Sequence, residues 1–236
     1  MTATPPIEPA PPRACCGSSL CRLVCAAVLI LILVSFRFDA RVFAWVSAMQ
    51  QPGLKSVANW VSCLGDWPPL AAVTALAWLG ALAAGSRRWM RILALVLLAS
   101  LLAGAVVNPL RILTGRARPD AAVPEGWYGP WAQGRSTMGR HQYSSFPSAH
   151  TTVAFAMAMP LLIFAGRRGV IALAVAALIG FSRIYLNVHH LSDVLAGAAL
   201  GSICGIIPCR WPALTSRLDR ALARTVNVSL RSSASP

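Results

Sequence analysis

The chain has 236 residues, of which 56% are hydrophobic and only 12% are charged, and its mean hydropathy is +0.62. Soluble domains carry about 25% charged residues, and the apolar residues here come in blocks that approach the length of a membrane span. The composition therefore excludes an ordinary soluble domain and predicts an integral membrane protein.

The net charge of +14 comes almost entirely from arginine, since Lys55 is the only lysine. Nucleic-acid-binding proteins gather basic residues on a soluble face, whereas many arginines here flank hydrophobic runs, where they set orientation and contact lipid headgroups. We therefore expect no nucleic-acid partner. The seven acidic residues are scattered, which argues against a Mg²⁺ or Ca²⁺ centre. Seven cysteines, an odd number with none in the long loop, argue against a disulfide framework.

The predicted elements begin with a Pro-rich stretch, residues 1–16, which we expect to be disordered. The first apolar run, 17–36, lacks a small-residue cleavage site and is predicted to be a retained span. Five more apolar runs follow, at about 67–86, 92–110, 147–166, 169–188 and 189–209. The sequence thus predicts an all-α polytopic membrane protein of about six transmembrane helices over residues 17–210, with an outer loop at 120–146.

The remaining residues, 211–236, form a basic tail. Leu214, Leu218 and Leu222 recur every four residues with arginines between them. The pattern predicts either an amphipathic cationic helix on the cytoplasmic leaflet or a solvated tail.

Arginines near the span ends favour one orientation. If the N-terminus is cytoplasmic, the inner side receives twelve of the 21 basic residues: Arg13, Arg22, Arg87, Arg88, Arg91, Arg167, Arg168, Arg210, Arg217, Arg220, Arg224 and Arg231. Because cytoplasmic flanks are enriched in basic residues, we expect a multi-pass protein of the cell membrane with both termini in the cytoplasm.

Two polar clusters lie at span ends. In "RILTGRARP", Arg111 and Arg118 are seven residues apart, which places them on one helical face before Pro119. In "FPSAH", Pro147 suits the first turn of a helix whose free N–H groups would attract an anion. Either cluster alone could be an ordinary interfacial feature.

A third cluster is "SRIYLNVHHLSD", residues 182–193. If a helix starts near His189, that residue and Asp193 are four apart and share a face. A carboxylate that holds one imidazole nitrogen leaves the other free as a nucleophile or base. His190 is three residues from Asp193, so spacing alone leaves both histidines open.

The order of the spans places all three clusters on the same side of the membrane. Together they supply arginines, a serine, a helix N-terminus, two histidines and a carboxylate. Such a set suits a phosphate, with fork-shaped donors for its oxygens, a nucleophile and a proton donor for the leaving group.

With these residues the sequence resembles the type 2 phosphatidic acid phosphatase superfamily, which includes membrane lipid phosphatases and, more distantly, vanadium haloperoxidases. The family pattern is Lys-x6-Arg-Pro, Pro-Ser-Gly-His and Ser-Arg-x5-His-x3-Asp. The corresponding residues here are Arg111, Arg118 and Pro119, then Pro147, Ser148, Ala149 and His150, then Ser182, Arg183, His189 and Asp193. Arg111 stands where the family has lysine and Ala149 where it has glycine, and neither change removes a reactive group.

The resemblance implies a core helical bundle like that of this superfamily and a mechanism that needs no cofactor or metal. By that resemblance, His189 attacks phosphorus, Asp193 fixes its tautomer, and His150 protonates the leaving oxygen and then activates water. The phosphoryl oxygens would be held by Arg111, Arg118, Arg183, Ser148 and the Ala149 N–H. The family register selects His189 over His190.

The expected function is hydrolysis of a lipid phosphate monoester or diphosphate at the extracytoplasmic surface. Undecaprenyl diphosphate, phosphatidic acid, phosphatidylglycerol phosphate and lipid A are substrates of family members. The expected partners are the bilayer and this lipid, and no motif indicates an oligomeric state. The alternatives are a phosphotransferase on the same scaffold and a nonenzymatic anion-binding, lipid-binding or transport protein. An intramembrane serine protease using Ser148 and His150 is disfavoured because its Gly-x-Ser-Gly motif is absent.

Overall fold

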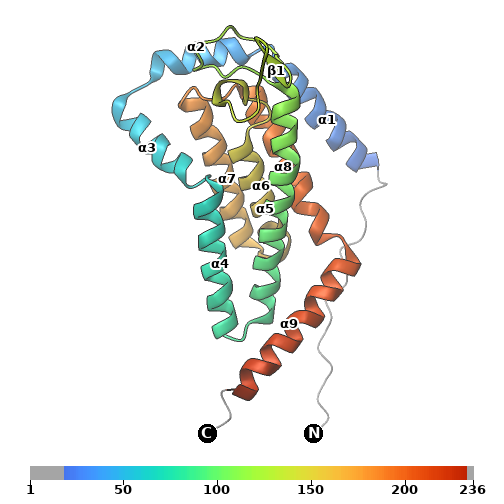
Figure 1. Cartoon of the computed structure of the whole chain (residues 1–236). Coiled ribbons are helices and arrows are strands. Elements are labelled where there is room, and N and C mark those ends of the chain that lie inside the picture. The colour runs from blue at the N-terminus through green and yellow to red at the C-terminus, as the bar shows by residue number, and fades with distance from the viewer. Residues whose placement is uncertain (1–18, 233–236) are drawn as a thin grey trace.

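The computed structural model describes residues 19–232, with side chains up to 222. Figure 1 shows an upright helical bundle covered at one end by a long loop. The elements are α1 (Ser19–Ser35), α2 (Asp39–Met49), α3 (Pro52–Cys63), α4 (Trp67–Ala83), α5 (Arg87–Thr114), β1 (Trp131–Ala132), β2 (Arg135–Ser136), a 3₁₀ turn (His141–Tyr143), α6 (Ala149–Ala165), α7 (Arg167–Tyr185), α8 (Leu191–Cys209) and α9 (Pro212–Ser232). The expected disorder of residues 1–16 lies outside the described residues.

All six helices predicted as spans are present, as α1, α4, α5, α6, α7 and α8. Within residues 19–232, three of them (α5, α7 and α8) are long and apolar enough to cross a bilayer, and α1 qualifies only together with α2, to which it is bent by 65°. The helices α4 and α6 are apolar but have 17 residues each. The all-α membrane architecture is confirmed, and the count of six spans stays a prediction.

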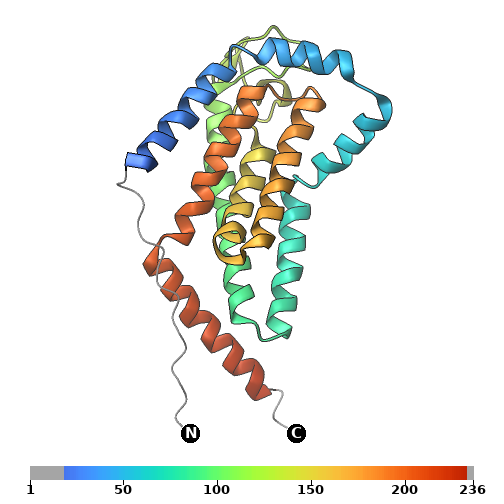
Figure 2. The ribbon, with the colours of Figure 1, turned by 180° about the vertical axis from the view of Figure 1, so that it is seen from behind.

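Helix α6 is the centre of the bundle and packs against α5, α7 and α8 (Figures 1 and 2). Its contact with α8 is made backbone to backbone, because three glycines of α8 face it: Gly197, Gly201 and Gly205. A Cβ at Gly201 would lie 2.2 Å from the carbonyl oxygen of Thr152. Small residues at such positions let membrane helices approach closely, and this contact sets the position of the α8 N-terminus beside that of α6.

Two helices, α2 and α3, were not predicted. Helix α2 lies across the loop-covered end of the bundle, and α3 returns along α7 to the bend at residues 64–66, where α4 begins (Figure 1). The bend brings Gly65 and Asp66 to the start of α6.

The basic tail forms α9, so the predicted helix is present, and its place on the cytoplasmic leaflet stays a prediction. Leu218 and Leu222 pack with Met90 of α5, and Arg91 lies 3.4 Å from Asp219. The side of α9 that carries these leucines is therefore attached to the bundle.

Candidate active site

The three polar clusters meet at the loop-covered end of the bundle. The Ser148 N–H at the start of α6 donates to the carbonyl of Asp193 at the start of α8 (3.0 Å). Helix α5 ends at Thr114, so Arg118 lies in the long loop after it and the predicted helical face shared with Arg111 is wrong. Arg118 donates to the carbonyl of Val188 between α7 and α8 (3.5 Å). Residues that lie 45 to 70 positions apart in the chain are thus brought together by the helix ends.

The imidazole of His189 lies beside the carboxylate of Asp193, with 3.4 Å between Nδ1 and Oδ2. Helix α8 begins at Leu191, two residues after His189, so the predicted start near His189 is confirmed and His189 itself precedes the helix. Its place is instead fixed by its own N–H, which donates to the Arg183 carbonyl (3.3 Å). His189 is 2% exposed, and neither ring nitrogen has a hydrogen-bond partner among the described residues.

Burial lowers the pKa of His189 to about 3, with Arg118 and Arg183 adding to this effect and Asp193 opposing it. The ring is therefore neutral at pH 7. A neutral imidazole with one nitrogen directed at a carboxylate has a free lone pair on the other nitrogen, which is the form that a nucleophile requires.

The neighbouring His190 is placed differently. Its backbone N–H donates to Oδ2 of Asp193 (2.8 Å), which caps α8, while its ring Nε2 lies 4.0 Å from Oε1 of Glu125. Burial, followed by the charge of Arg116, lowers the pKa of His190. The His190 ring thus lies beside Glu125 of the outer loop, whereas the His189 ring lies beside Asp193.

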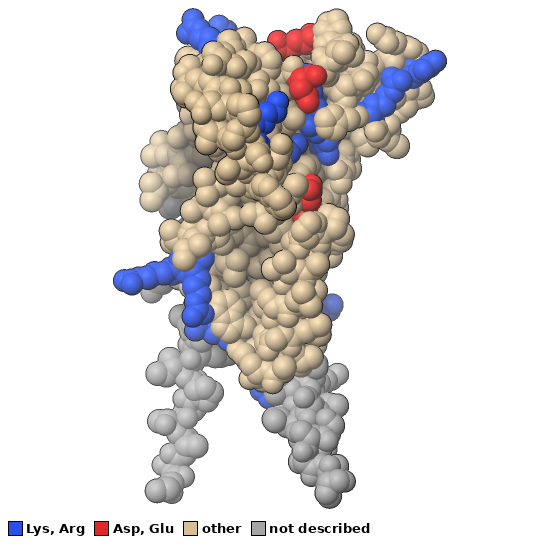
Figure 3. Space-filling model, turned by 90° about the vertical axis from the view of Figure 1, so that its left-hand side faces the viewer, with Lys and Arg blue, Asp and Glu red and all other residues tan. Residues whose placement is uncertain are grey.

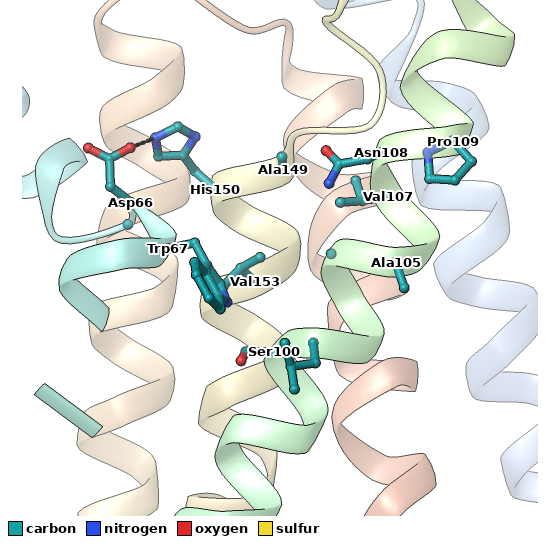
Figure 4. Close-up of a pocket in the computed structure, with 13 residues that line it drawn as sticks. Asp66, Trp67, Ser100, Ala105, Val107, Asn108, Pro109, Ala149, His150 and Val153 are labelled. Carbon is teal, nitrogen blue, oxygen red and sulfur yellow. Dashed lines mark hydrogen bonds and ion pairs between the residues drawn. The ribbon is translucent and has the colours of Figure 1, made fainter. Parts of the chain in front are cut away.

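His150 lies in the first turn of α6, and its Nε2 is 2.7 Å from Oδ1 of Asp66 (Figure 4). Asp66 was not predicted to have a role. A single carboxylate before a Trp-Pro-Pro helix start looks like an ordinary end of a span, so the sequence contains no signal for this contact. Asp66 is half exposed, so the pair is accessible from the surface.

An apolar cavity of about 670 Å³ extends from this pair between α4, α5 and α6 (Figure 4). Leu101, Val107 and Val153 are among its apolar lining residues, and Asp66 and His150 lie at its polar end. An imidazole and a carboxylate at the end of an apolar cavity suit a ligand with a long hydrocarbon part and a polar head.

Three arginines surround the site. Nε and Nη2 of Arg111 donate to the Ser144 carbonyl (3.1 and 2.9 Å), and Arg183 donates to the Ser62 hydroxyl. Burial and the charges of Arg111 and Arg183 lower the pKa of Arg118 to about 10, so it remains charged at pH 7. The buried Nε atoms of Arg118 and Arg183 lack partners among the described residues. Like charges held together in this way favour an anion between them.

The remaining predicted residues, Ser148 and Ala149, lie at the N-terminus of α6. The helix begins at Ala149, so Pro147 precedes it and its predicted place in the first turn is wrong. Ser148 is fully buried, and its hydroxyl accepts from Thr151 (3.0 Å). Ala149 has no positive φ; among the described non-glycine residues only Gln133 and Asn187 do. The backbone here therefore does not need the family glycine's freedom.

A buried ion-pair cluster next to Asp193 was not predicted either. Arg116 binds the carboxylates of Asp39 and Asp193, both at 2.7 Å.

Within residues 19–222, no three His, Cys, Asp or Glu side chains are grouped to hold a metal ion.

The sequence is similar to a known protein family and to several known proteins. The sequence model of the PAP2 superfamily matches residues 92–216. The lipid A 1-phosphatase of Rhizobium johnstonii is 31% identical over 134 residues, which cover 50% of this chain and 52% of that protein. Lipid phosphate phosphatase 1 of Arabidopsis thaliana is 30% identical over 132 residues, which cover 46% of this chain and 40% of that protein. The matches thus span about half the length of these curated relatives.

Two solved structures are similar to this one over a larger share of the chain than these sequence matches cover. The crystal structure of Aquifex aeolicus LpxE has a TM-score of 0.59 and 25% identity, and the match covers 74% of this chain and 96% of that one. A transmembrane PAP2-type phosphatidylglycerolphosphate phosphatase from Bacillus subtilis has a TM-score of 0.56 and 22% identity, covering 77% and 92%. The second likeness shows the fold alone.

Proposed function

Because the chain belongs to the PAP2 superfamily, we propose that it is a membrane lipid phosphatase that hydrolyses a lipid phosphate monoester or diphosphate through a phosphohistidine. The observation that carries the proposal is the neutral, buried His189, which lies beside Asp193 and within the field of buried arginines. This combination supplies a nucleophile and the charges that hold its target.

In the first step, Nε2 of His189 attacks phosphorus while the bond to the leaving oxygen breaks. Asp193 faces Nδ1, so it fixes the proton there and stabilises the ring as it gains positive charge. His150 donates a proton to the leaving oxygen. In the second step, His150 takes a proton from water, the hydroxide attacks the phosphohistidine, and His189 and phosphate are released.

The phosphoryl oxygens are held by Arg111, Arg118 and Arg183, with the Ser148 hydroxyl and the Ala149 N–H at the start of α6. These arginines stabilise the negative charge of the transition state. Hydrolysis is therefore expected to need no metal and to continue in EDTA.

The apolar cavity supports a lipid as the substrate, because it would hold the hydrocarbon part while the phosphate lies beyond His150. The names of the relatives also support it, since they include lipid A 1-phosphatase and lipid phosphate phosphatase. We propose that the site opens to the extracytoplasmic side. The substrates to compare are lipid A, phosphatidic acid, phosphatidylglycerol phosphate and undecaprenyl diphosphate.

The test is phosphate release by the purified protein from these four lipids in EDTA, with and without an added alcohol. His189→Ala and His150→Ala should each reduce turnover by several orders of magnitude, whereas His190→Ala, which changes a ring outside the proposed chemistry, should stay within a few fold. The melting temperature of each variant checks that it is folded.

Each alternative predicts a different result. Near-wild-type hydrolysis by folded His189→Ala would refute the mechanism. Phosphorylated alcohol as the main product would indicate a phosphotransferase, and lipid binding without phosphate release a binding or transport protein.

A further inference from the structure

Arg116 lies between two buried carboxylates. Its Nη1 is 2.7 Å from Oδ1 of Asp193, and its Nη2 is 2.7 Å from Oδ2 of Asp39. The three side chains are at most 4% exposed. The guanidinium is also flanked by two rings, with Cζ 5.1 Å from the centroid of Phe36 and 5.0 Å from that of Trp127. Arg116 is therefore held in one orientation.

Asp39, at the start of α2, acts on the first turn of α8. Its Oδ1 accepts from the Ser192 N–H (2.9 Å), and its Oδ2 accepts from the Ser192 hydroxyl (2.5 Å). The first N–H groups of a helix have no intrahelical acceptor, so Asp39 caps α8 from a segment 153 residues away in the chain. The corner between α1 and α2 thereby fixes the helix that carries Asp193.

The Asp193 carboxylate is held from three directions. Oδ1 accepts from Arg116, while Oδ2 accepts from the Ser145 hydroxyl (2.5 Å) and the His190 N–H (2.8 Å). Oδ2 is also the atom 3.4 Å from Nδ1 of His189. The direction in which Asp193 meets His189 is thus set by its other partners, and Arg116 is the charged one.

We propose that Arg116 and Asp39 are positioning residues for the phosphatase reaction, which hold Asp193 in place against His189. This inference rests on the proposed function. A buried cluster of one arginine and two carboxylates is a weak source of stability, because desolvation offsets the attraction. It does, however, restrict geometry, and a displacement of about 1 Å in a reacting group can reduce turnover about 100-fold.

The experiment compares kcat and KM of Asp39→Asn and Arg116→Lys with those of the wild type, per folded protein. Asp39→Asn keeps the size of the side chain but removes its charge. Arg116→Lys keeps the charge but replaces the two nitrogens that bind Asp193 and Asp39 with a single one. We expect kcat to fall about 10- to 100-fold, with KM within about twofold, because neither residue contacts substrate. Arg37→Gln, an exposed arginine at the same corner, and Asp219→Asn, the acidic partner of Arg91, should match the wild type.

The controls separate the two proposals. His189→Ala is assayed alongside as the inactive reference. A wild type without phosphatase activity would overturn the proposed function together with this inference. An active wild type whose Asp39→Asn and Arg116→Lys variants match the controls per folded protein would overturn this inference alone. A raised KM with unchanged kcat, or failure of both variants to fold, would also overturn it, since the residues would then bind substrate or only maintain the fold.

Discussion

Burial lowers the pKa of both kinds of basic residue at the candidate site, but it leaves only the arginine charged at neutral pH. It lowers the pKa of His189 to about 3, which removes its charge at neutral pH, and that of Arg118 to about 10, which does not. One environment can thus hold a neutral imidazole beside a cationic guanidinium. Histidine and arginine respond differently only because their ordinary pKa values differ by several units.

The lowered pKa of His189 predicts a pH dependence of stability. The unfolded chain binds a proton at His189 below about pH 6.5, whereas the folded chain does so only near pH 3. Stability is therefore complete above pH 6.5 and is lost as pH falls toward 3. Between pH 7 and pH 5 this residue should account for about 2 kcal/mol of lost unfolding free energy.

The measurement is denaturant unfolding in detergent at several pH values, for the wild type and His189→Gln. The glutamine does not titrate, so the variant should lose about 2 kcal/mol less than the wild type between pH 7 and pH 5. The other histidines are present in both proteins and cancel. Parallel pH curves would contradict the burial of a neutral His189.

Arg111 shows how a departure from the family pattern can be accommodated. Two of its nitrogens donate to one carbonyl oxygen, that of Ser144 in the outer loop. A lysine offers a single nitrogen and could not make both bonds. Arginine at this position therefore ties the loop to α5 while keeping the positive charge that the family lysine supplies.

At the scale of helices, the site depends on how closely α8 approaches α6. Gly197, Gly201 and Gly205 recur every four residues, and a Cβ at each would lie within 2.8 Å of a carbonyl oxygen of α6 or of its N-cap, Ser148. The Ser148 N–H bond to the Asp193 carbonyl is at the end of the same interface. The glycine face therefore determines the spacing between the first turn of α6 and Asp193.

Gly201→Ala should force α8 away from α6 and lower the free energy of unfolding by about 1–3 kcal/mol. Turnover per folded protein should also fall, since Asp193 moves with α8. Gly80→Ala is the matched control, because a Cβ there has nothing within 4 Å. Thermal unfolding and phosphate release measure the two effects, and equal melting temperatures for the two variants would contradict the close packing.

The helices show what could be predicted from the sequence. Apolar runs predicted α1 and α4 to α8 because hydropathy is a local property. Helices α2 and α3 have 11 and 12 residues and mix polar with apolar positions, so neither resembled a span. Family spacing also predicted His150 and His189, whose rings lie beside Asp66 and Asp193. Asp39, Asp66 and Arg116 were missed because their contacts join segments 77 to 153 residues apart, and each looked like an ordinary charge near a span.

At the scale of the whole molecule, the two ends of the bundle differ. The outer loop, α2 and the candidate site lie at one end, and the connections α4–α5 and α6–α7 lie toward the other (Figures 1 and 2). The face shown in Figure 3 has charged side chains at its upper end and basic ones lower down, with a mostly uncharged surface between them. Arg87, Arg88, Arg167 and Arg168 belong to the lower connections, as expected if that end is cytoplasmic.

This orientation predicts which residues a membrane-impermeant thiol reagent can reach. In a variant whose seven cysteines are replaced by serine, Ser136→Cys in β2 should be labelled in intact cells. Ser216→Cys in α9 should be labelled only after permeabilisation. Both positions are exposed in the folded chain, so the difference would report the side of the membrane. Labelling of Ser216→Cys but not Ser136→Cys in intact cells would place the site on the cytoplasmic side, where it would meet lipid phosphates of the inner leaflet.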